Sequence, residues 1–320
     1  MAKYDVTTLG EILIDLTVVG KSENGSSLLE ENPGGAPANV AASISKLGGK
    51  SAFIGKIGSD RFGDVALSAL KNVGVDCSAV KIEERQRTSV SFVSLGKNGE
   101  RTFSFERGAD TLLSSSEVSE NLIASSKFLH IGSLSLTEES ASSATREAIK
   151  LAKKFGTFIS YDPNWREVAW SDSSLGIKTM KSIFPYADFV KLSAEELELI
   201  YGKNESNAAQ NILNEGVRLV CVTLGKDGVF YKTQNSQGII SIPNYKIDAI
   251  DTTGAGDAFT GALLYRLTRR ENPFDFTKGE IENDLNFANA AATLCVSRRG
   301  AIPSLASLYE VEKLLNMFTS

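Results

Sequence analysis

Short apolar runs alternate with amphipathic segments along most of this chain, and this alternation is the strongest constraint on its fold. Four of the apolar runs have the length of buried strands: SAFIGKIG (51–58), FLHIGSL (128–134), FISYDPN (158–164) and FVKLS (189–193). Apolar residues at helical spacing occupy five other intervals: 36–47, 64–74, 138–154, 174–184 and 194–202. Strands that alternate with helices pair in parallel, and helices cover both faces of such a sheet. The sequence therefore predicts an α/β fold with a central, mainly parallel sheet.

The two ends of the chain extend this pattern. Residues 4–19 predict a strand, a glycine turn and a second strand. Toward the other end, three further runs are strand-like: 218–225, 228–232 and 238–243. Two segments after Gly256 have helical spacing: 258–270 and 283–298. Because no internal repeat or low-complexity linker divides the 320 residues, a single domain spanning 1–320 is expected.

Residues 88–107 depart from the alternation of strands and helices. Here apolar and polar residues alternate on either side of Lys97-Asn98-Gly99. This pattern predicts a β-hairpin with one polar face, because Asn-Gly favours a tight hairpin turn. A polar face does not fit a sheet that is buried on both sides. We therefore expect the hairpin to project from the central sheet and to cover a site.

The charge and hydropathy of the chain exclude several classes of partner and indicate where the protein is located. The net charge of −5 does not favour nucleic-acid binding, which uses a basic surface. No stretch reaches the ~20 apolar residues that a membrane span requires. The N-terminal residues lack the apolar core of a secretion signal, because Asp15 interrupts the best candidate. We expect a cytoplasmic protein that binds neither nucleic acid nor membrane.

The cysteines and the histidine exclude several chemistries. Cys77, Cys221 and Cys295 are isolated in the sequence, so they predict neither a disulfide framework nor a cysteine metal site. His130 is the only histidine, and its apolar neighbours favour a structural role. Most zinc sites, and most mechanisms that pair histidine with serine or cysteine, are therefore excluded.

Residues 247–264, IDAIDTTGAGDAFTGALL, combine a glycine-rich turn, a carboxylate and the start of an apolar helix. The backbone N–H groups of 252–256 could converge on an anion at the helix start, although a plain turn fits them equally well. Asp257 then has two interpretations. It is either a charge that stabilises the helix terminus by roughly 0.3–1 kcal/mol, or a base that accepts a proton from a substrate hydroxyl. In the second case the amides would stabilise a phosphoryl group during its transfer.

Two better-known phosphate motifs are incomplete in this chain. GAGDAF begins like the dinucleotide-binding fingerprint, but Phe259 occupies the position of its third glycine. LGGKS ends like a P-loop, but Ile44 stands where the first glycine is required. An anion site at 252–256 would therefore belong to neither of these classes.

Two segments resemble the signatures of the PfkB, or ribokinase-like, family of sugar and nucleoside kinases. DTTGAGDAFTGAL (251–263) resembles the second signature, while GEILIDL, which ends at Asp15, and residues 32–63 are similar to the first. The similarity extends through essentially the whole chain. It implies a ribokinase-like fold, in which a central, mainly parallel sheet lies between helices and a small β-sheet lid covers the sugar. The lid segments of this chain would lie near 12–33 and 86–108.

The resemblance also implies catalytic and sugar-binding roles. The matching catalytic positions are Asp257 as the base, Gly254, Ala255 and Gly256 as the anion hole, and Arg166, which the segment DPNWR (162–166) would direct toward the transferred phosphoryl group. The matching sugar-binding positions are Asp15, Gly34, Gly35 and Asn39. Without the resemblance, Asn39 would be interpreted as a polar residue early in a helix and Arg166 as an exposed arginine.

The nucleotide site is implied by weaker matches. SAEE (193–196) resembles the N-x-x-E element near the metal and the phosphates, with Ser193 in place of the usual asparagine. Glu196 could act on Mg²⁺ through water. TLGKDGVF (223–230) resembles the strand and turn that border the nucleotide, although it would also suit an ordinary hairpin. The implied nucleotide-binding set is Lys191, Ser193, Glu196, Thr223, Gly225, Gly228 and Asn289, the last beside the adenine.

A monovalent cation site, for K⁺, is implied by a further match. CVSRRGAIPS (295–304) resembles the loop whose carbonyl groups join those of a second segment around the cation. The implied residues, acting largely through their backbone, are Asp251, Thr253, Cys295, Arg298, Gly300 and Ser304.

The choice of sugar depends on one segment. FERGADTLL (105–113) resembles the fructokinase branch, in which an arginine here reaches the sugar. Arg107 is then a specificity residue and Asp110 orders the segment, while a charged lid edge is the alternative. The resemblance implies an ATP-dependent fructokinase that phosphorylates the 6-hydroxyl. An exposed lid sheet could pair with the lid of a second copy, which would give a homodimer. A kinase for 2-keto-3-deoxygluconate or ribose, and a non-catalytic sugar- or nucleotide-binding regulator, are the alternatives.

Overall fold

The computed structural model describes residues 2–95, 101–202 and 204–318, and within these ranges its main sheet has nine strands. Their order is β13-β12-β11-β10-β9-β8-β1-β4-β5. All strands from β11 to β5 run parallel, and β12 and β13 are antiparallel additions at one edge. The strands are β1 (Tyr4–Leu9), β4 (Ser51–Gly58), β5 (Asp76–Glu83), β8 (Ser126–Ile131), β9 (Phe158–Tyr161), β10 (Phe189–Ser193), β11 (Leu219–Thr223), β12 (Val229–Lys232) and β13 (Gln237–Ile240).

Helices cover both faces of this sheet, because side chains of both faces are apolar and buried. One core joins Leu9, Ile131 and Val190 of the sheet to the first helix group, and another joins Val6 and Phe128 to most of the second. The remaining helix of the second group, at 61–72, packs in a third core with Phe53 and Ile57. The first group is α3 (Glu120–Ala124), α4 (Glu139–Phe155), α5 (Ser173–Lys181), α6 (Ala194–Tyr201) and α7 (Glu205–Asn214). The second is α1 (Ala36–Lys46), α2 (Arg61–Asn72), α8 (Ala255–Leu267), α9 (Lys278–Val296) and α10 (Leu308–Asn316). Short 3₁₀ helices occupy Ala109–Leu112, Ser115–Glu117, Leu134–Leu136, Glu167–Ala169, Phe184–Tyr186, Gly225–Asp227 and Ile302–Ser304.

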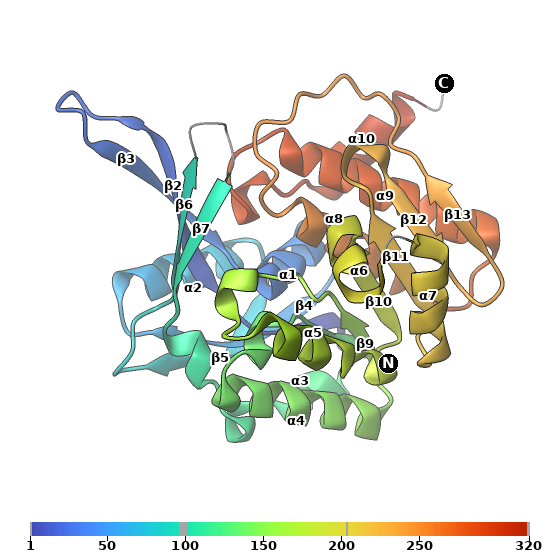
Figure 1. Ribbon diagram of the computed structural model, residues 1–320, viewed down its shortest axis with the longest axis horizontal. Helices are drawn as coiled ribbons and strands as arrows, with labels where there is room; N and C mark the ends of the chain where they lie inside the picture. The colour runs from blue at the N-terminus through green and yellow to red at the C-terminus, as the bar shows by residue number, and fades with distance from the viewer. Residues whose placement is uncertain (1, 96–100, 203, 319–320) are drawn as a thin grey trace.

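A second, four-stranded sheet projects from the main body (Figure 1). Its order is β3-β2-β6-β7, with strands β2 (Leu13–Lys21), β3 (Ser27–Gly34), β6 (Val90–Leu95) and β7 (Arg101–Glu106). β2 and β6 are parallel, and each is extended by an antiparallel neighbour. The register places Asp15 opposite Ser91, and Ser91 opposite Phe105, so these three side chains share one face.

The predicted fold class is confirmed. The main sheet is mainly parallel and lies between helices, and the small sheet uses the segments that follow β1 and β5. The hairpin predicted over 88–107 is present, because β6 and β7 pair in antiparallel orientation. Residues 96–100, where the Asn-Gly turn is predicted, lie outside the described residues.

Several boundaries differ from the sequence prediction because capping interactions start the helices earlier. α9 begins at Lys278, since Thr277 and Glu280 form a reciprocal capping box. α2 begins at Arg61, because the Asp60 carboxylate accepts the Gly63 amide. β13 ends at Ile240, before Pro243, where a longer run was predicted. Four strands and α-helices were not predicted at all, namely β5, α3, α7 and α10, and the short 3₁₀ helices were not predicted either.

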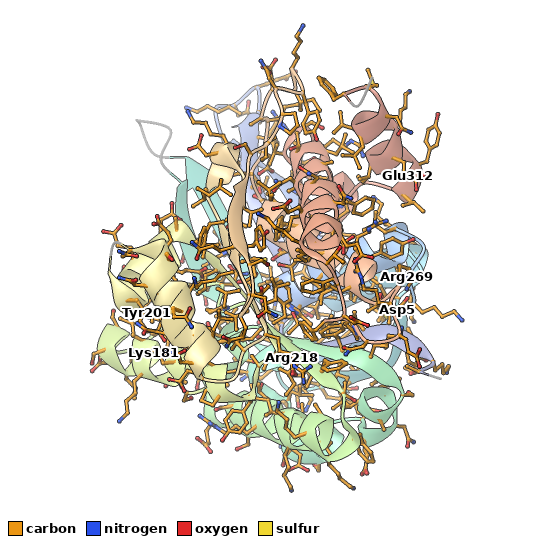
Figure 2. All side chains as sticks on the ribbon, turned by 90° about the vertical axis from the view of Figure 1, so that its right-hand side faces the viewer. Asp5, Lys181, Tyr201, Arg218, Arg269 and Glu312 are labelled. Atoms are coloured by element: carbon orange, nitrogen blue, oxygen red, sulfur yellow. The ribbon has the colours of Figure 1, made fainter. Side chains whose placement is uncertain are left out.

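Side-chain contacts at the surface join neighbouring elements around the sheet. Figure 2 shows Arg269, just beyond α8, beside Asp5 of β1, with which it forms an ion pair. Lys181 at the end of α5 lies over the ring of Tyr201 in α6, 4.6 Å from the ring centre. Among the helices of the described ranges, none combines the length and the hydropathy that crossing a membrane requires.

Candidate active site

A cavity of about 680 Å³ lies where the carboxyl ends of the main-sheet strands face the small sheet. Ligand sites in open α/β sheets are commonly found at this edge. The small sheet contributes the polar face that carries Asp15. The wall is formed by Glu11, Leu13, Asp15, Gly35, Ala36, Asn39, Ser91, Phe105, 132–134, 164–168, Lys191, 252–254, Gly256 and Asp257.

Asp257 lies in the first turn of α8 and is 8% exposed. Gly254 begins this helix in the left-handed conformation, at φ 78°, which favours glycine. The Asp257 carboxylate accepts a 2.7 Å hydrogen bond from Asn39 Nδ2 of α1. Burial raises the pKa of Asp257 to about 6, although the Asn39 hydrogen bond opposes this rise. Asp257 is therefore ionised at neutral pH and becomes protonated under mildly acidic conditions.

The start of α1 is built around Glu11, a residue that the sequence analysis did not identify. The Glu11 Oε1 atom accepts the backbone N–H of Ala36 at 3.0 Å, and so caps a helix whose own N-cap residue, Gly35, has no side chain. Gly35 has φ 105°, and a Cβ on it would lie 2.6 Å from the Glu11 carbonyl oxygen. Only glycine fits there. Asn39 follows one turn later, facing Asp257.

Glu11 and Asp15 are two further carboxyl groups on the same wall. Burial raises the pKa of Glu11 to about 7 and that of Asp15 to about 6, while Ser91 opposes the rise at Asp15. Gly34 leaves space for Asp15, because a Cβ there would lie 2.8 Å from Asp15 Oδ2. An acidic residue directly after Gly10, at the carboxyl end of β1, was the available signal for Glu11.

Lys191 provides a buried positive charge at the opposite side of the cavity. Its Nζ donates to Asp162 Oδ2 at 3.0 Å, and a Cβ on Gly256 would lie 2.9 Å from that nitrogen. Burial alone would lower the pKa of Lys191, but Asp162 and Glu196 raise it above the ordinary value. The ammonium group therefore stays charged beside the backbone turn of 254–256. Asp162 was not singled out in the sequence analysis.

Glu196 has a structural task that sequence alone did not reveal. Its Oε2 accepts the Ser193 N–H at 2.7 Å, and Ser193 Oγ accepts the Glu196 N–H, which makes a capping box at the start of α6. Its Oε1 accepts the Trp165 N–H at 2.5 Å, which fixes the segment beside Arg166. Ser193 thus takes part through its helix-capping hydroxyl. Arg166 lines the cavity, and its positive charge opposes the rise that burial causes in the pKa of Asp15 and of Asp257.

Arg107 does not line the cavity. Its guanidinium donates to Asp110 Oδ2 from Nη2 at 2.5 Å and from Nε at 3.1 Å, and to Thr137 Oγ1 at 3.2 Å. The pairing with Asp110 agrees with an ordering role for that residue. Glu11 lies on the wall and is close enough to Arg107 for its pKa to be lowered by the arginine's charge.

The other residues of the implied nucleotide set lie outside this cavity. Thr223 Oγ1 donates to the Leu192 carbonyl at 3.3 Å, and Asn289 Nδ2 donates to the Ile240 carbonyl at 3.1 Å. Gly225 and Gly228 form the turn between β11 and β12. Gly228 has φ 105°, and a Cβ there would lie 2.0 Å from the Ile240 carbonyl oxygen, so this turn requires glycine for structural reasons alone.

The two segments implied for a monovalent cation lie side by side. Asp251 Oδ1 accepts the Thr253 N–H at 2.9 Å, and its Oδ2 accepts the Gly300 N–H at 3.1 Å. Cys295 Sγ lies 3.0 Å from Ser304 Oγ, while Arg298 pairs with Glu310 of α10. The Asp251 carboxylate therefore joins the loop before α8 to the loop after α9.

His130 and the cysteines do not line the cavity. His130 Nδ1 is 2.9 Å from Ser160 Oγ in the core, and burial lowers the pKa of the imidazole to about 3, which keeps it neutral. Cys77, Cys221 and Cys295 are free thiols.

Comparisons with known proteins agree with this geometry. Residues 3–308 match the pattern of the pfkB family carbohydrate kinases. The chain is 40% identical over 319 residues to a probable fructokinase-5 of Arabidopsis thaliana, with 97% of each chain covered.

Two solved structures are similar in fold and in sequence. A fructokinase from Xylella fastidiosa with bound ATP has a TM-score of 0.91 and 29% identity, covering 99% of this chain and 100% of that one. A double-mutant fructokinase from Vibrio cholerae O395, in a form with fructose, ADP and potassium ion bound, has a TM-score of 0.87 and 33% identity, covering 98% and 99%. With the family pattern matched over nearly its whole length, the chain belongs to the pfkB family of carbohydrate kinases.

Proposed function

We propose that this carbohydrate kinase is an ATP-dependent fructokinase that phosphorylates the 6-hydroxyl of fructose, with Asp257 as the general base. The observation that carries the proposal is the position of Asp257, buried in the cavity at the start of α8 and oriented by Asn39. The choice of fructose is supported by relatives that bear the name fructokinase and are about 40% identical over 97% of the chain.

The proposed chemistry uses the residues on both sides of Asp257. Its carboxylate takes the proton of the 6-hydroxyl as that oxygen forms a bond to the γ-phosphorus and the bond from phosphorus to the ADP oxygen breaks. The backbone N–H groups of 254–256 stabilise the charge on the phosphoryl oxygens, and Arg166 and Lys191 add positive charge. The proton on Asp257 is then released to solvent. The small sheet, which carries Asp15 and Phe105, is proposed as the lid that excludes water.

The donor groups suit Mg²⁺ and K⁺. Mg²⁺ would be held mainly by the phosphates of ATP, with Glu196 reaching it through water. When bound, Mg²⁺ would neutralise phosphate charge. For K⁺, the loops at 251–253 and 295–304 would supply backbone carbonyl groups, and the Asp251 carboxylate holds the two loops together by accepting the Thr253 and Gly300 amides. Because ATP is the proposed donor, we place the reaction in the cytoplasm.

A second copy of the chain is the proposed macromolecular partner. The small sheet exposes large apolar side chains, with Leu28 at 47%, Leu29 at 46% and Phe92 at 40% exposure. Apolar surface of this kind favours an interface. Sedimentation of the unaltered protein and of a Leu28→Ser, Leu29→Ser variant would measure the oligomeric state, and a monomer in both would contradict the dimer.

The function is tested by a panel of acceptors with ATP: fructose, ribose, 2-keto-3-deoxygluconate and a nucleoside. We expect the highest kcat/KM with fructose and the product fructose 6-phosphate, identified by NMR. Equal kcat/KM for ribose and fructose would contradict the fructokinase assignment. No transfer to any acceptor would instead support a binding protein without catalytic activity.

A further inference from the structure

The segment that carries Arg166 is held in an unusual shape by tertiary contacts. It leaves β9 through Asn164, whose φ of 46° lies in the left-handed region that few residues other than glycine adopt. The next residue, Trp165, donates its backbone N–H to Glu196 Oε1, and its carbonyl oxygen accepts Arg166 Nη1 at 2.9 Å. The direction of the Arg166 side chain therefore depends on the position of Trp165.

The indole of Trp165 is in turn held by a second indole. The rings of Trp165 and Trp170 stack with their centres 5.6 Å apart and their planes 14° apart. The short 3₁₀ helix between them, Glu167–Ala169, turns the chain so that the two rings meet. Stacked aromatic rings attract each other beyond the gain from their buried area. Trp165 lines the cavity, whereas Trp170 is not among the lining residues, so Trp170 supports the wall without belonging to it.

Both rings pack against α5 at a position where that helix has a glycine. A Cβ on Gly176 would lie 2.7 Å from two ring carbons of Trp165 and 2.8 Å from one of Trp170. These atoms belong to rigid, stacked rings, so a Cβ would force the pair to move. Glycine weakens the interior of a helix, and the space that the two indoles need gives its presence in α5 a physical reason.

We propose that Trp170 is a positioning residue, which acts through Trp165 to hold the Arg166 guanidinium at the wall of the cavity. A positive charge that is already oriented stabilises a transferred phosphoryl group without reorganisation during the reaction. Without this support, the long arginine side chain would have to be ordered when ATP binds, which costs conformational entropy. The proposal deepens the proposed function and rests on it for the role of Arg166.

The experiment is a double-mutant cycle of Trp170→Ala and Arg166→Ala. Trp170→Ala removes the stacking partner, and a misplacement of Arg166 by about 1 Å should lower kcat by ~10–100-fold, with KM for fructose changed less. In a protein that already lacks the guanidinium, the same substitution should lower kcat by less than ~2-fold, because residues that act through one another are not additive. Trp170 Nε1 is buried and has no hydrogen-bond partner among the described residues. Trp170→Phe keeps a ring for the stack and should therefore recover most of the lost activity.

A pair of glycine substitutions tests the same contact while both rings are kept. Gly176→Ala places a Cβ against the two indoles, while Gly279→Ala in α9 is the matched control, because a Cβ there meets nothing within 4 Å. Both replace a helical glycine by a better helix former. Trp165 and Trp170 are the only tryptophans of the sequence, so the intrinsic tryptophan emission reports on this stack alone. Only Gly176→Ala should shift the emission, and only Gly176→Ala should lower kcat, by ~10-fold or more.

The proposal is overturned if Trp170→Ala lowers kcat by the same factor with and without Arg166, or if Gly176→Ala shifts the emission but leaves kcat equal to that of Gly279→Ala. In both cases the kinase assignment would stand, since the unaltered enzyme would still phosphorylate fructose. If Trp170→Ala does not fold, the cycle is run with Gly176→Ala in its place. The same cycle is also measured in ATP affinity by calorimetry. If the losses of affinity are non-additive but no acceptor is phosphorylated, the positioning residue is supported and the proposed reaction fails.

Discussion

Two sets of residues on the cavity wall have opposite hydrogen-bonding character. The first, called here the acceptor end, contains Glu11, Asp15 and Asn39; the second, called the donor end, contains the amides at the start of α8, Arg166 and Lys191, and the two sets meet at the Asn39–Asp257 hydrogen bond. A sugar offers hydroxyl donors and a nucleotide offers phosphate acceptors, so each end is complementary to a different substrate. Asp257 lies at the boundary, held by Asn39 from the acceptor end and affected by Lys191 and Arg166 from the donor end.

The comparison indicates that the carboxylates of the cavity have different functions. All three of Glu11, Asp15 and Asp257 have a pKa raised by burial, yet of these three only Asp257 lies in the first turn of α8, directly after the glycine-rich turn. A raised pKa marks a desolvated carboxyl, whereas its neighbours decide between binding a hydroxyl and removing its proton.

The largest loss of activity is expected from a substitution of Asp257, which lies between the acceptor end and the donor end. Asp257→Asn removes the proton acceptor but keeps the size of the side chain and one oxygen that can accept the Asn39 hydrogen bond. We expect kcat to fall by ~10²–10⁴-fold, the usual contribution of a general base. Calorimetry should show that ATP and fructose still bind within a few-fold of normal. A near-normal kcat with an unchanged melting temperature would make Asp257 a helix-capping charge only.

The donor end is tested by Arg166→Ala. Loss of a positive charge near the transferred group should lower kcat by ~10²–10³-fold, as for the loss of one preorganised donor. KM for fructose should change less than kcat, because the acceptor end is intact. Arg146→Ala, in an exposed position on α4, is the control. An equal effect of both substitutions would remove Arg166 from the phosphoryl site.

The pH dependence should separate the two ends. Because burial raises the pKa of Asp257 to about 6, the active, ionised form is lost as the pH falls through that value. We expect kcat to fall ~10-fold per unit below it. Protonation of Asp15 and Glu11 occurs in the same region and should appear mainly in KM for fructose. A kcat that stays constant down to about pH 4 would contradict Asp257 as the base.

The smallest expected effect concerns the paired loops at 251–253 and 295–304. A monovalent cation between them would order the amides at the start of α8 without touching either substrate. Replacing K⁺ by tetramethylammonium at constant ionic strength should therefore lower kcat only a few-fold, with KM for fructose unchanged. If kcat is the same in K⁺ and in tetramethylammonium, the loops do not bind an activating cation.

The sequence by itself determined the fold class and the central feature of the site. The alternation of strands and helices predicted the parallel sheet, because periodic burial is a local property of the chain. The order of glycines, Asp257 and apolar residues located a helix start beside an acid, since capping and helix polarity are also local. The strands of the 88–107 hairpin were likewise predicted from their alternation.

Only the tertiary structure decided how these local features combine. Asn39 and Asp257 are separated by 218 positions in the chain, yet they form the hydrogen bond at the centre of the cavity. Arg107 was expected to reach the sugar and Asp110 to order the segment; in the structure Arg107 pairs with Asp110 and donates to Thr137, and it is not among the residues that line the cavity. Glu11 acquires its role from the amide of Ala36, which a crossover brings to the end of β1. Pairings of this kind depend on three-dimensional packing and burial, and a linear pattern does not encode which distant partner a polar side chain will meet.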